Sequence, residues 1–134
     1  MIPRKIKMWH DLALSISKMS DFPRIKIGAL IVKNGGLVCV GFNRKKSHPV
    51  QKKYNIHRGF DSEPKDYIHA EISAIVKAKN VDLRGSSIYI SRNNVNGDMA
   101  MCRPCKACME AIRESGISKV FYMSELGYER LTFA

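Results

Sequence analysis

The sequence predicts an α/β fold in which helices cover both faces of a β-sheet, and three observations support this prediction. Strand-like apolar runs alternate along the chain with segments of helical periodicity, which is typical of largely parallel sheets. Two of these runs flank Asn34-Gly35-Gly36, a strong signal for an antiparallel hairpin. Finally, residues 124–127 are too short a connection for a crossover, so a strand at 128–133 should return antiparallel.

The chain begins with a predicted helix followed by the hairpin. Apolar residues recur at steps of three and four from Ile6 to Met19, which predicts an amphipathic helix. It should end near Ser20–Pro23, because the residue before a proline disfavours helical geometry. The apolar, β-branched runs 25–33 and 37–42 are the two predicted hairpin strands.

Residues 41–66 show no clear period and carry many cationic side chains. We therefore expect a long basic loop, and loops of this length in a compact domain are usually functional or disordered. Residues 69–79 then predict a helix that is apolar over much of its girth and therefore buried.

The second half of the chain again alternates predicted strands with a predicted helix. Residues 87–92 and 119–123 are predicted strands, separated by a loop at 93–101 and a helix at 104–114. The helix should begin with Pro104, whose missing N–H is no loss in the first turn, and Gly116 suits its exit.

The size and charge of the chain limit the possible functions. With 134 residues and no repeat or linker, residues 1–134 are expected to form a single domain. The formal net charge of +11 favours phosphorylated or polyanionic ligands, although a solvated basic face without a specific partner would give the same value. No run approaches the roughly 18 apolar residues of a membrane span, and residues 1–7 lack a signal-peptide pattern. We therefore expect a cytoplasmic protein without a membrane partner, in which clustered cysteines bind metal more often than they form disulfides.

Cys105 and Cys108 are three positions apart at the start of the predicted helix 104–114, so their side chains share one face. Helix N-termini also stabilise thiolates, the form that binds metal. Taken alone, such a pair could be redox-active, half of a four-cysteine structural zinc site, or two buried thiols. His69 begins the preceding helix, and two helix N-termini can converge at the carboxyl ends of neighbouring strands.

The set His69, Cys105 and Cys108 leaves a tetrahedral Zn²⁺ ion one position for water, as in catalytic sites. Glu71 would face that water without binding the metal. H-x-E followed by P-C-x-x-C is the signature of zinc-dependent nucleobase deaminases. Cys102 lies outside the predicted helix, so we expect it not to bind the metal. A closed site that included Cys102 would instead indicate a structural zinc module.

His69-Ala70-Glu71 and Pro104-Cys105-Lys106-Ala107-Cys108 resemble the cytidine/deoxycytidylate deaminase superfamily, as does the hairpin with its Gly41-Phe42-Asn43 end. The resemblance implies a three-layer α/β/α sandwich with a mixed five-stranded sheet. The short tail resembles the branch with an antiparallel last strand, which includes free-nucleoside deaminases. The resemblance also implies that Asn43 contacts the substrate sugar, that Ala70 and Pro104 line the substrate site, and that the protein forms homo-oligomers. The 93–101 loop is longer than a compact member needs, which leaves the pocket shape open.

The expected reaction is hydrolytic deamination of a cytosine ring. Zinc makes hydroxide available near neutral pH. Glu71 would take the water proton, pass it to the ring N3, and later protonate the leaving amine. The products would be a uracil ring and ammonia.

Three functions remain open from the sequence. The first is deamination of a free cytosine nucleotide or nucleoside, with a phosphate held by some of the loop cations (Arg44, Lys45, Lys46, Lys52, Lys53 and Arg58). The second is editing of single-stranded DNA or RNA, which the charge suits but for which the aromatic candidates (Trp9, Phe42, Tyr54, Phe60 and Tyr67) are scattered. The third is a non-catalytic zinc module. Adenine, guanine or a modified base also stays possible.

The remaining histidines and Cys39 have no assigned chemistry. His10 is expected on the exposed face of the first helix, and His48 and His57 in the basic loop, most simply exposed to solvent. Cys39 is expected to be a small core residue of the second strand.

Overall fold

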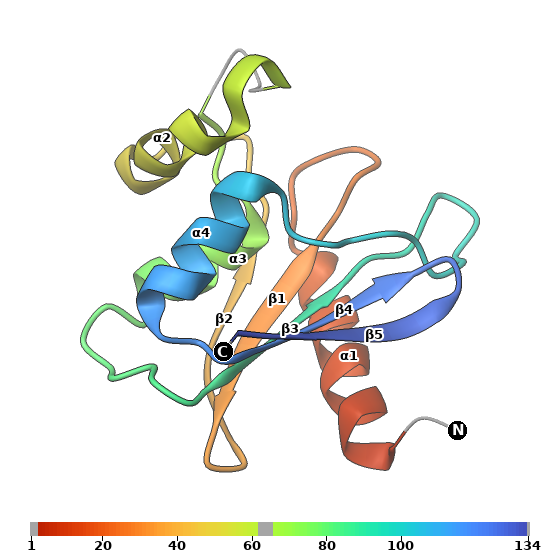
Figure 1. Cartoon of the computed structure of the whole chain (residues 1–134). Helices are drawn as coiled ribbons and strands as arrows, with labels where there is room; N and C mark the ends of the chain where they lie inside the picture. Colours follow the sequence, from red (N-terminus) through yellow and green to blue (C-terminus); the bar gives the residue numbers. More distant parts are fainter. Residues whose placement is uncertain (1–2, 62–65, 134) are drawn as a thin grey trace.

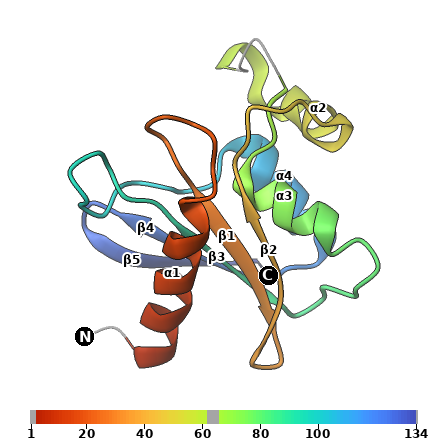
Figure 2. The same cartoon turned by 180° about the vertical axis from the view of Figure 1, so that it is seen from behind.

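The computed structural model describes residues 3–61 and 66–133, and the side chains of all of these except 59–61. A five-stranded sheet in the order β2-β1-β3-β4-β5 forms the middle layer. Helix α1 lies on one face of this sheet, and α3 and α4 lie on the other (Figures 1 and 2). The elements are α1 (Arg4–Ser17), β1 (Gly28–Lys33), β2 (Gly36–Phe42), α2 (Pro49–Asn55), the 3-10 helix η1 (Ile56–Asp61), α3 (Ala70–Lys77), β3 (Ser87–Ser91), α4 (Lys106–Ser115), β4 (Lys119–Ser124) and β5 (Gly127–Thr132). The three-layer α/β/α prediction is therefore confirmed.

The strand directions confirm the mixed sheet but correct the expectation that it is largely parallel. Strand β1 pairs antiparallel with both β2 and β3, and only β3 and β4 pair in parallel. The helical crossover through α3 does join two strands of the same direction, β2 and β3. The hairpin, however, places β1 between them, so they are not neighbours. As predicted from the short connection, β5 returns antiparallel to β4.

The hairpin turn and one close helix contact explain two glycines of the β1–β2 hairpin. Asn34 and Gly35 both have positive φ values, 53° and 79°, as a two-residue type I′ turn requires. Gly41 of β2 lies directly against the backbone of α3 at Ala70 and Ala74, so a Cβ atom there would collide with it. This contact fixes the start of α3 against the sheet.

The expected long loop at 41–66 contains two helical segments, α2 and η1. Pro49 occupies the first turn of α2, and the His48 side chain caps it by accepting a hydrogen bond from the Val50 N–H (3.1 Å). These two residues at the helix start were the sequence signal that could have indicated α2. The helix has only seven residues, however, which is too short to show a helical period.

His10 is fully buried, which contradicts its expected exposure on α1. Its Nδ1 atom lies 2.9 Å from the Ser91 hydroxyl, which itself donates to the His10 carbonyl. The ring contacts Tyr89 edge-on and lies 4.9 Å from the Tyr128 ring centroid. Burial lowers the pKa of His10 to about 4, so the ring is neutral. The reason for the burial is that α1 turns this face to β1 and β3.

The end of α1 and the start of α4 also differ from the prediction. Helix α1 ends at Ser17 rather than near Ser20–Pro23. Helix α4 begins at Lys106, so Pro104 precedes it and Cys105 is its N-cap, with extended backbone angles. Gly116 ends α4 in the left-handed conformation as predicted. Across the described ranges, every helix is too short or too polar to cross a membrane.

Candidate metal centre

The predicted metal ligands meet where two helices begin. His69 is the N-cap of α3 and Cys105 is the N-cap of α4, while Cys108 occupies the third position of α4. The His69 Nδ1 atom lies 3.6 Å from the Cys105 sulfur and 3.3 Å from the Cys108 sulfur. All three ligand atoms lie within 4.8 Å of one another. Their spacing, their positions at helix starts and the H-x-E and P-C-x-x-C motifs predicted that these residues meet, and the structure brings them into one cluster.

This donor set has the chemistry of a zinc site. One imidazole nitrogen and two thiol sulfurs are standard zinc ligands, and their convergence leaves a fourth tetrahedral position. The pKa of the Cys105 thiol is lowered, first by its hydrogen bond with Cys108 and then, against the opposing effect of burial, by His69. A thiolate is the form that binds metal.

Glu71 lies in the first turn of α3 and is only 4% exposed. Burial raises the pKa of this carboxyl group, while the neighbouring His69 opposes the rise. A carboxyl group in this position can hold or release a proton next to the ligand cluster. Both ligand-bearing helix starts and Glu71 thus face one small region.

A buried amide network holds the start of α3. The Oε1 atom of Gln51, a fully buried residue of α2, accepts the His69 backbone N–H at 2.9 Å. The Gln51 amide donates to Asn55, and Asn55 donates to Asp66 (2.8 and 2.9 Å). Gln51 could not be identified from the sequence, because it lies in the segment without a period and no motif marks it.

A pocket of about 150 Å³ adjoins the metal cluster and is lined by Phe22, Ile25, Ile27, Asn43 and His69. The Asn43 side chain is 6% exposed and clamps the loop above the pocket. Its oxygen accepts the Ile27 N–H (2.9 Å), and its nitrogen donates to the Ile25 carbonyl (2.7 Å). An amide can form further hydrogen bonds beyond these two, so Asn43 can hold the loop and still contact a ligand.

The other predicted substrate-binding residues lie at different positions relative to this pocket. Ala70 and Pro104 are buried beside the ligands His69 and Cys105. Lys45 is exposed and lies 5.8 Å above the ring of Phe22, which lines the pocket. Arg44 does not line it and belongs instead to a second pocket on the opposite side of the same segment.

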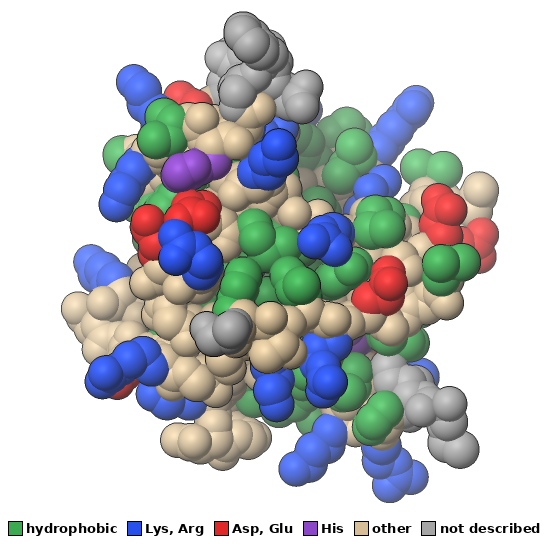
Figure 3. Space-filling view, viewed as in Figure 1, with side chains coloured by type: hydrophobic (Ala, Val, Ile, Leu, Met, Phe, Trp, Pro, Cys, Tyr) green, Lys and Arg blue, Asp and Glu red, His purple; other side chains and the backbone are tan. Residues whose placement is uncertain are grey.

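The other described cations and aromatic candidates lie in different parts of the fold. Lysine and arginine side chains are spread around the face shown in Figure 3 rather than gathered at one point. Trp9 of α1 packs against Tyr89 on one face of the sheet, whereas Tyr54 of α2 donates to Glu114 of α4 on the other face. Tyr67 packs edge-on against Phe22. The Phe60 side chain lies outside the described residues.

The two cysteines without a predicted metal role are held elsewhere. Cys102 is buried, donates to the Ile90 carbonyl and accepts the Met123 N–H, both at 3.2 Å. Cys39 is half-buried in β2 and donates to the Ala74 carbonyl at 3.0 Å. In the part of the chain that the structure describes, neither cysteine belongs to the metal cluster.

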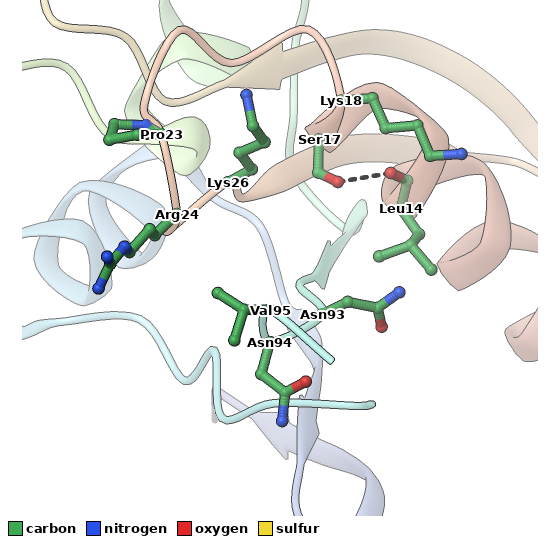
Figure 4. Close-up of a pocket in the computed structure, with 9 residues that line it drawn as sticks. All are labelled: Leu14, Ser17, Lys18, Pro23, Arg24, Lys26, Asn93, Asn94 and Val95. Atoms are coloured by element: carbon green, nitrogen blue, oxygen red, sulfur yellow. Dashed lines mark hydrogen bonds between the residues drawn. The ribbon is translucent and has the colours of Figure 1, made fainter. Parts of the chain in front are cut away.

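A larger pocket of about 410 Å³ lies on the other side of the loop 18–27, against the long loop at Asn93–Val95. Figure 4 shows that its three cations, Lys18, Arg24 and Lys26, extend in different directions and do not converge on one point. We assign no ligand to this pocket.

The family model described as the cytidine and deoxycytidylate deaminase zinc-binding region matches residues 3–124. The chain belongs to this family. It is therefore a deaminase of the cytidine/deoxycytidylate type, as the motifs at residues 69–71 and 104–108 predicted.

Phage proteins are among its relatives. A deoxycytidylate deaminase of Mycobacterium phage D29 is 28% identical over 125 residues, covering 85% of this chain and 90% of the relative. The crystal structure of dCMP deaminase from cyanophage S-TIM5 in apo form superposes with a TM-score of 0.64 at 28% identity, covering 91% of this chain and 84% of that one. The structure of the same phage enzyme with dCMP and dUMP gives a TM-score of 0.64 at 27% identity, with coverages of 91% and 82%. An uncharacterised deaminase from Aliivibrio fischeri is 29% identical, covering 90% of this chain and 74% of the relative.

Proposed function

We propose that this protein hydrolyses the amino group of a cytosine nucleotide of the dCMP type, with zinc held by His69, Cys105 and Cys108. The observation that carries this proposal is the convergence of their three ligand atoms beside the buried Glu71. A structural zinc site has no use for that carboxyl group, so its position favours an enzyme over a zinc-binding module.

The roles of the residues follow from their positions. Zinc bound by the three ligands would supply a Lewis acid that makes water a nucleophile near neutral pH. Glu71 would accept a proton from the attacking water and pass it to the ring N3. It would later take the second proton of that water, from the C4 hydroxyl group, and give it to the leaving amine. Water adds at C4 and ammonia departs, which leaves a uracil ring. The loop that Asn43 clamps would cover the base.

The cation at the rim of the pocket and the named relatives favour a nucleotide over a bare nucleoside as the substrate. The pocket of about 150 Å³ is smaller than the roughly 300–1,000 Å³ usual for ligand pockets, so only part of a nucleotide would be enclosed. A phosphate would then lie at the rim, where Lys45 stands beside Phe22. The phage relatives named deoxycytidylate deaminase, and the neighbour solved with dCMP and dUMP, support the same substrate class.

The test is an ammonia-release screen over cytidine, deoxycytidine, their monophosphates and a cytosine-containing oligonucleotide. We expect the highest kcat/KM with a monophosphate, and about a threefold rise in KM for it in Lys45→Gln, as for a surface charge pair. Release from the oligonucleotide alone would refute the free-nucleotide proposal. Metal analysis of the purified protein should find about one zinc per chain, and the cluster geometry predicts its loss in Cys108→Ala.

Homo-oligomer formation remains a prediction from the family resemblance. Hydrophobic side chains gather in the middle of the face shown in Figure 3, between α4 and the β4–β5 hairpin. Exposed apolar patches often mark contact surfaces between proteins. Sedimentation of the purified chain at several concentrations would show whether it self-associates.

A further inference from the structure

The parallel strands β3 and β4 separate at their carboxyl ends, and the segment 100–102 enters the sheet at this point. The register of the pair runs only to Tyr89 and Phe121. Two residues further along β4, the Met123 carbonyl accepts the Cys102 N–H at 3.0 Å. The segment that leads to the start of α4 is therefore attached to the end of the sheet.

The Cys102 thiol joins the two separated strands. Its S–H group donates to the Ile90 carbonyl of β3, and its sulfur accepts the Met123 N–H of β4, both at 3.2 Å. A cysteine can donate and accept in this way only while it is protonated, and burial raises the pKa of Cys102 to about 12. The side chain is therefore held as a neutral thiol that connects β3 to β4.

Arg92 fixes the two residues before Cys102. The Arg92 side chain donates from Nη1 to the Met101 carbonyl at 3.1 Å, and the Arg92 carbonyl accepts the Ala100 N–H at 3.1 Å. Arg92 follows directly after β3, so both bonds tie the segment to the end of that strand. Three consecutive residues, 100 to 102, are thus anchored on the ends of β3 and β4.

The connection from this anchor to the metal cluster is short and stiff. Only Arg103 and Pro104 separate Cys102 from Cys105, so the three steps span at most about 11 Å. A proline fixes its own φ angle and keeps the preceding residue extended. Pro104 is buried, and Cys105 has extended backbone angles (φ −67°, ψ 171°). A displacement of Cys102 would therefore move the Cys105 sulfur, whereas Cys108 is held by the packing of α4.

We propose that Cys102 is a positioning residue of the metal centre, which anchors the segment that carries Cys105 and does not itself bind the metal. This role rests on the zinc assignment of the proposed function. Partners that orient metal ligands commonly change metal affinity 10- to 100-fold when they are removed. The two thiol hydrogen bonds also keep Cys102, which has the C-x-x-C spacing of a zinc ligand, out of the fourth metal position.

The test uses the full chain, three variants and one control. Cys102→Ala removes both thiol hydrogen bonds, and Cys102→Ser keeps a donor and an acceptor. Arg92→Met removes the bond to the Met101 carbonyl. Cys39→Ala is the matched control, because it also deletes a thiol that donates to a carbonyl, that of Ala74, but on β2 and not on the segment before Cys105.

Zinc affinity would be measured by competition with a chelator, and the visible spectrum would be recorded at saturating Co²⁺. We expect zinc affinity to fall by at least about tenfold in Cys102→Ala, to fall less in Cys102→Ser and Arg92→Met, and to be unchanged in Cys39→Ala. The d–d bands of the Co²⁺ form should shift in Cys102→Ala, because the ligand geometry changes. The thiolate-to-cobalt charge-transfer intensity should stay that of the wild type, because both thiolate ligands are still present.

Two results would overturn this proposal and leave the zinc assignment intact. Wild-type zinc affinity and an unchanged Co²⁺ spectrum in Cys102→Ala would show that Cys102 serves only the fold. A loss of charge-transfer intensity in that variant would make Cys102 a third thiolate ligand. If the wild-type chain bound neither Zn²⁺ nor Co²⁺, the zinc assignment would fail and this proposal with it. Thermal unfolding is the folding control, and if Cys102→Ala does not fold, Cys102→Ser and Arg92→Met provide the same comparison.

Discussion

The substitution Gln51→Leu tests whether the network behind the metal cluster positions His69. In the structure the Gln51 side chain accepts the His69 N–H and donates to Asn55. Leucine has a similar volume but can do neither, so two partner groups would lose their hydrogen bonds. His69 is the N-cap of α3, and its backbone angles determine where its ring points.

The expected magnitude follows from these two bonds. A buried group left without a partner costs about 1–3 kcal/mol, so the loss of two such bonds should lower the free energy of unfolding by roughly 2–6 kcal/mol. Partners that orient metal ligands affect metal affinity by about 10- to 100-fold when removed. We therefore expect zinc affinity to fall by at least about tenfold in Gln51→Leu. Gln51→Glu keeps the acceptor for the His69 N–H and should lose less.

The assay is competition for zinc with a chromogenic chelator, together with the visible spectrum of the Co²⁺-substituted protein. Asn55→Ala is the control, because it removes a partner of Gln51 but leaves the bond to His69. If Gln51→Leu were less stable yet bound zinc with wild-type affinity and an unchanged Co²⁺ spectrum, then Gln51 would serve only the fold. The positioning role would be refuted.

Three further predictions concern single residues. Glu71→Gln should lower kcat by roughly 10²–10⁴-fold while about one zinc per chain is retained, and normal turnover would remove Glu71 from the mechanism. Cys105→Ala should lose zinc in metal analysis, so a fully loaded variant would contradict the ligand assignment. Burial lowers the pKa of His10 from 6.5 to about 4 in the folded protein. Between these two pH values His10 is therefore neutral in the folded protein but binds a proton in the unfolded chain. The free energy of unfolding should therefore be highest above pH 6.5 and fall by about 3 kcal/mol as the pH drops toward 4. Urea unfolding should show this fall in the wild type but not in His10→Phe.

The local elements could be predicted because each depends on neighbouring residues. The turn at Asn34-Gly35 needs residues that tolerate positive φ, and the exit of α4 needs Gly116 for the same reason. The antiparallel β5 follows from a connection too short for a crossover. The metal cluster was predictable too, because helix N-termini at strand ends bring distant motifs together.

Other features depend on packing between residues that are far apart in the sequence. The exposure expected for His10 was wrong, because its environment consists of Ser91, Tyr89 and Tyr128, which lie far along the chain. The neighbours of β1 also depend on which strand the hairpin is placed beside, which no local pattern encodes.

The candidate site shows the same division between sequence and tertiary structure. The residue types at 69, 71, 105 and 108 and their spacing determine the reaction class, because the chemistry needs those donors and that carboxyl group. The sequence alone could not separate Arg44 from Lys45, which are adjacent in the chain. The structure separates them, because Arg44 lines one pocket while Lys45 lies above Phe22, which lines the pocket beside the metal cluster. It also assigns Gln51 to the support of His69, a contact that exists only once α2 and α3 have packed together.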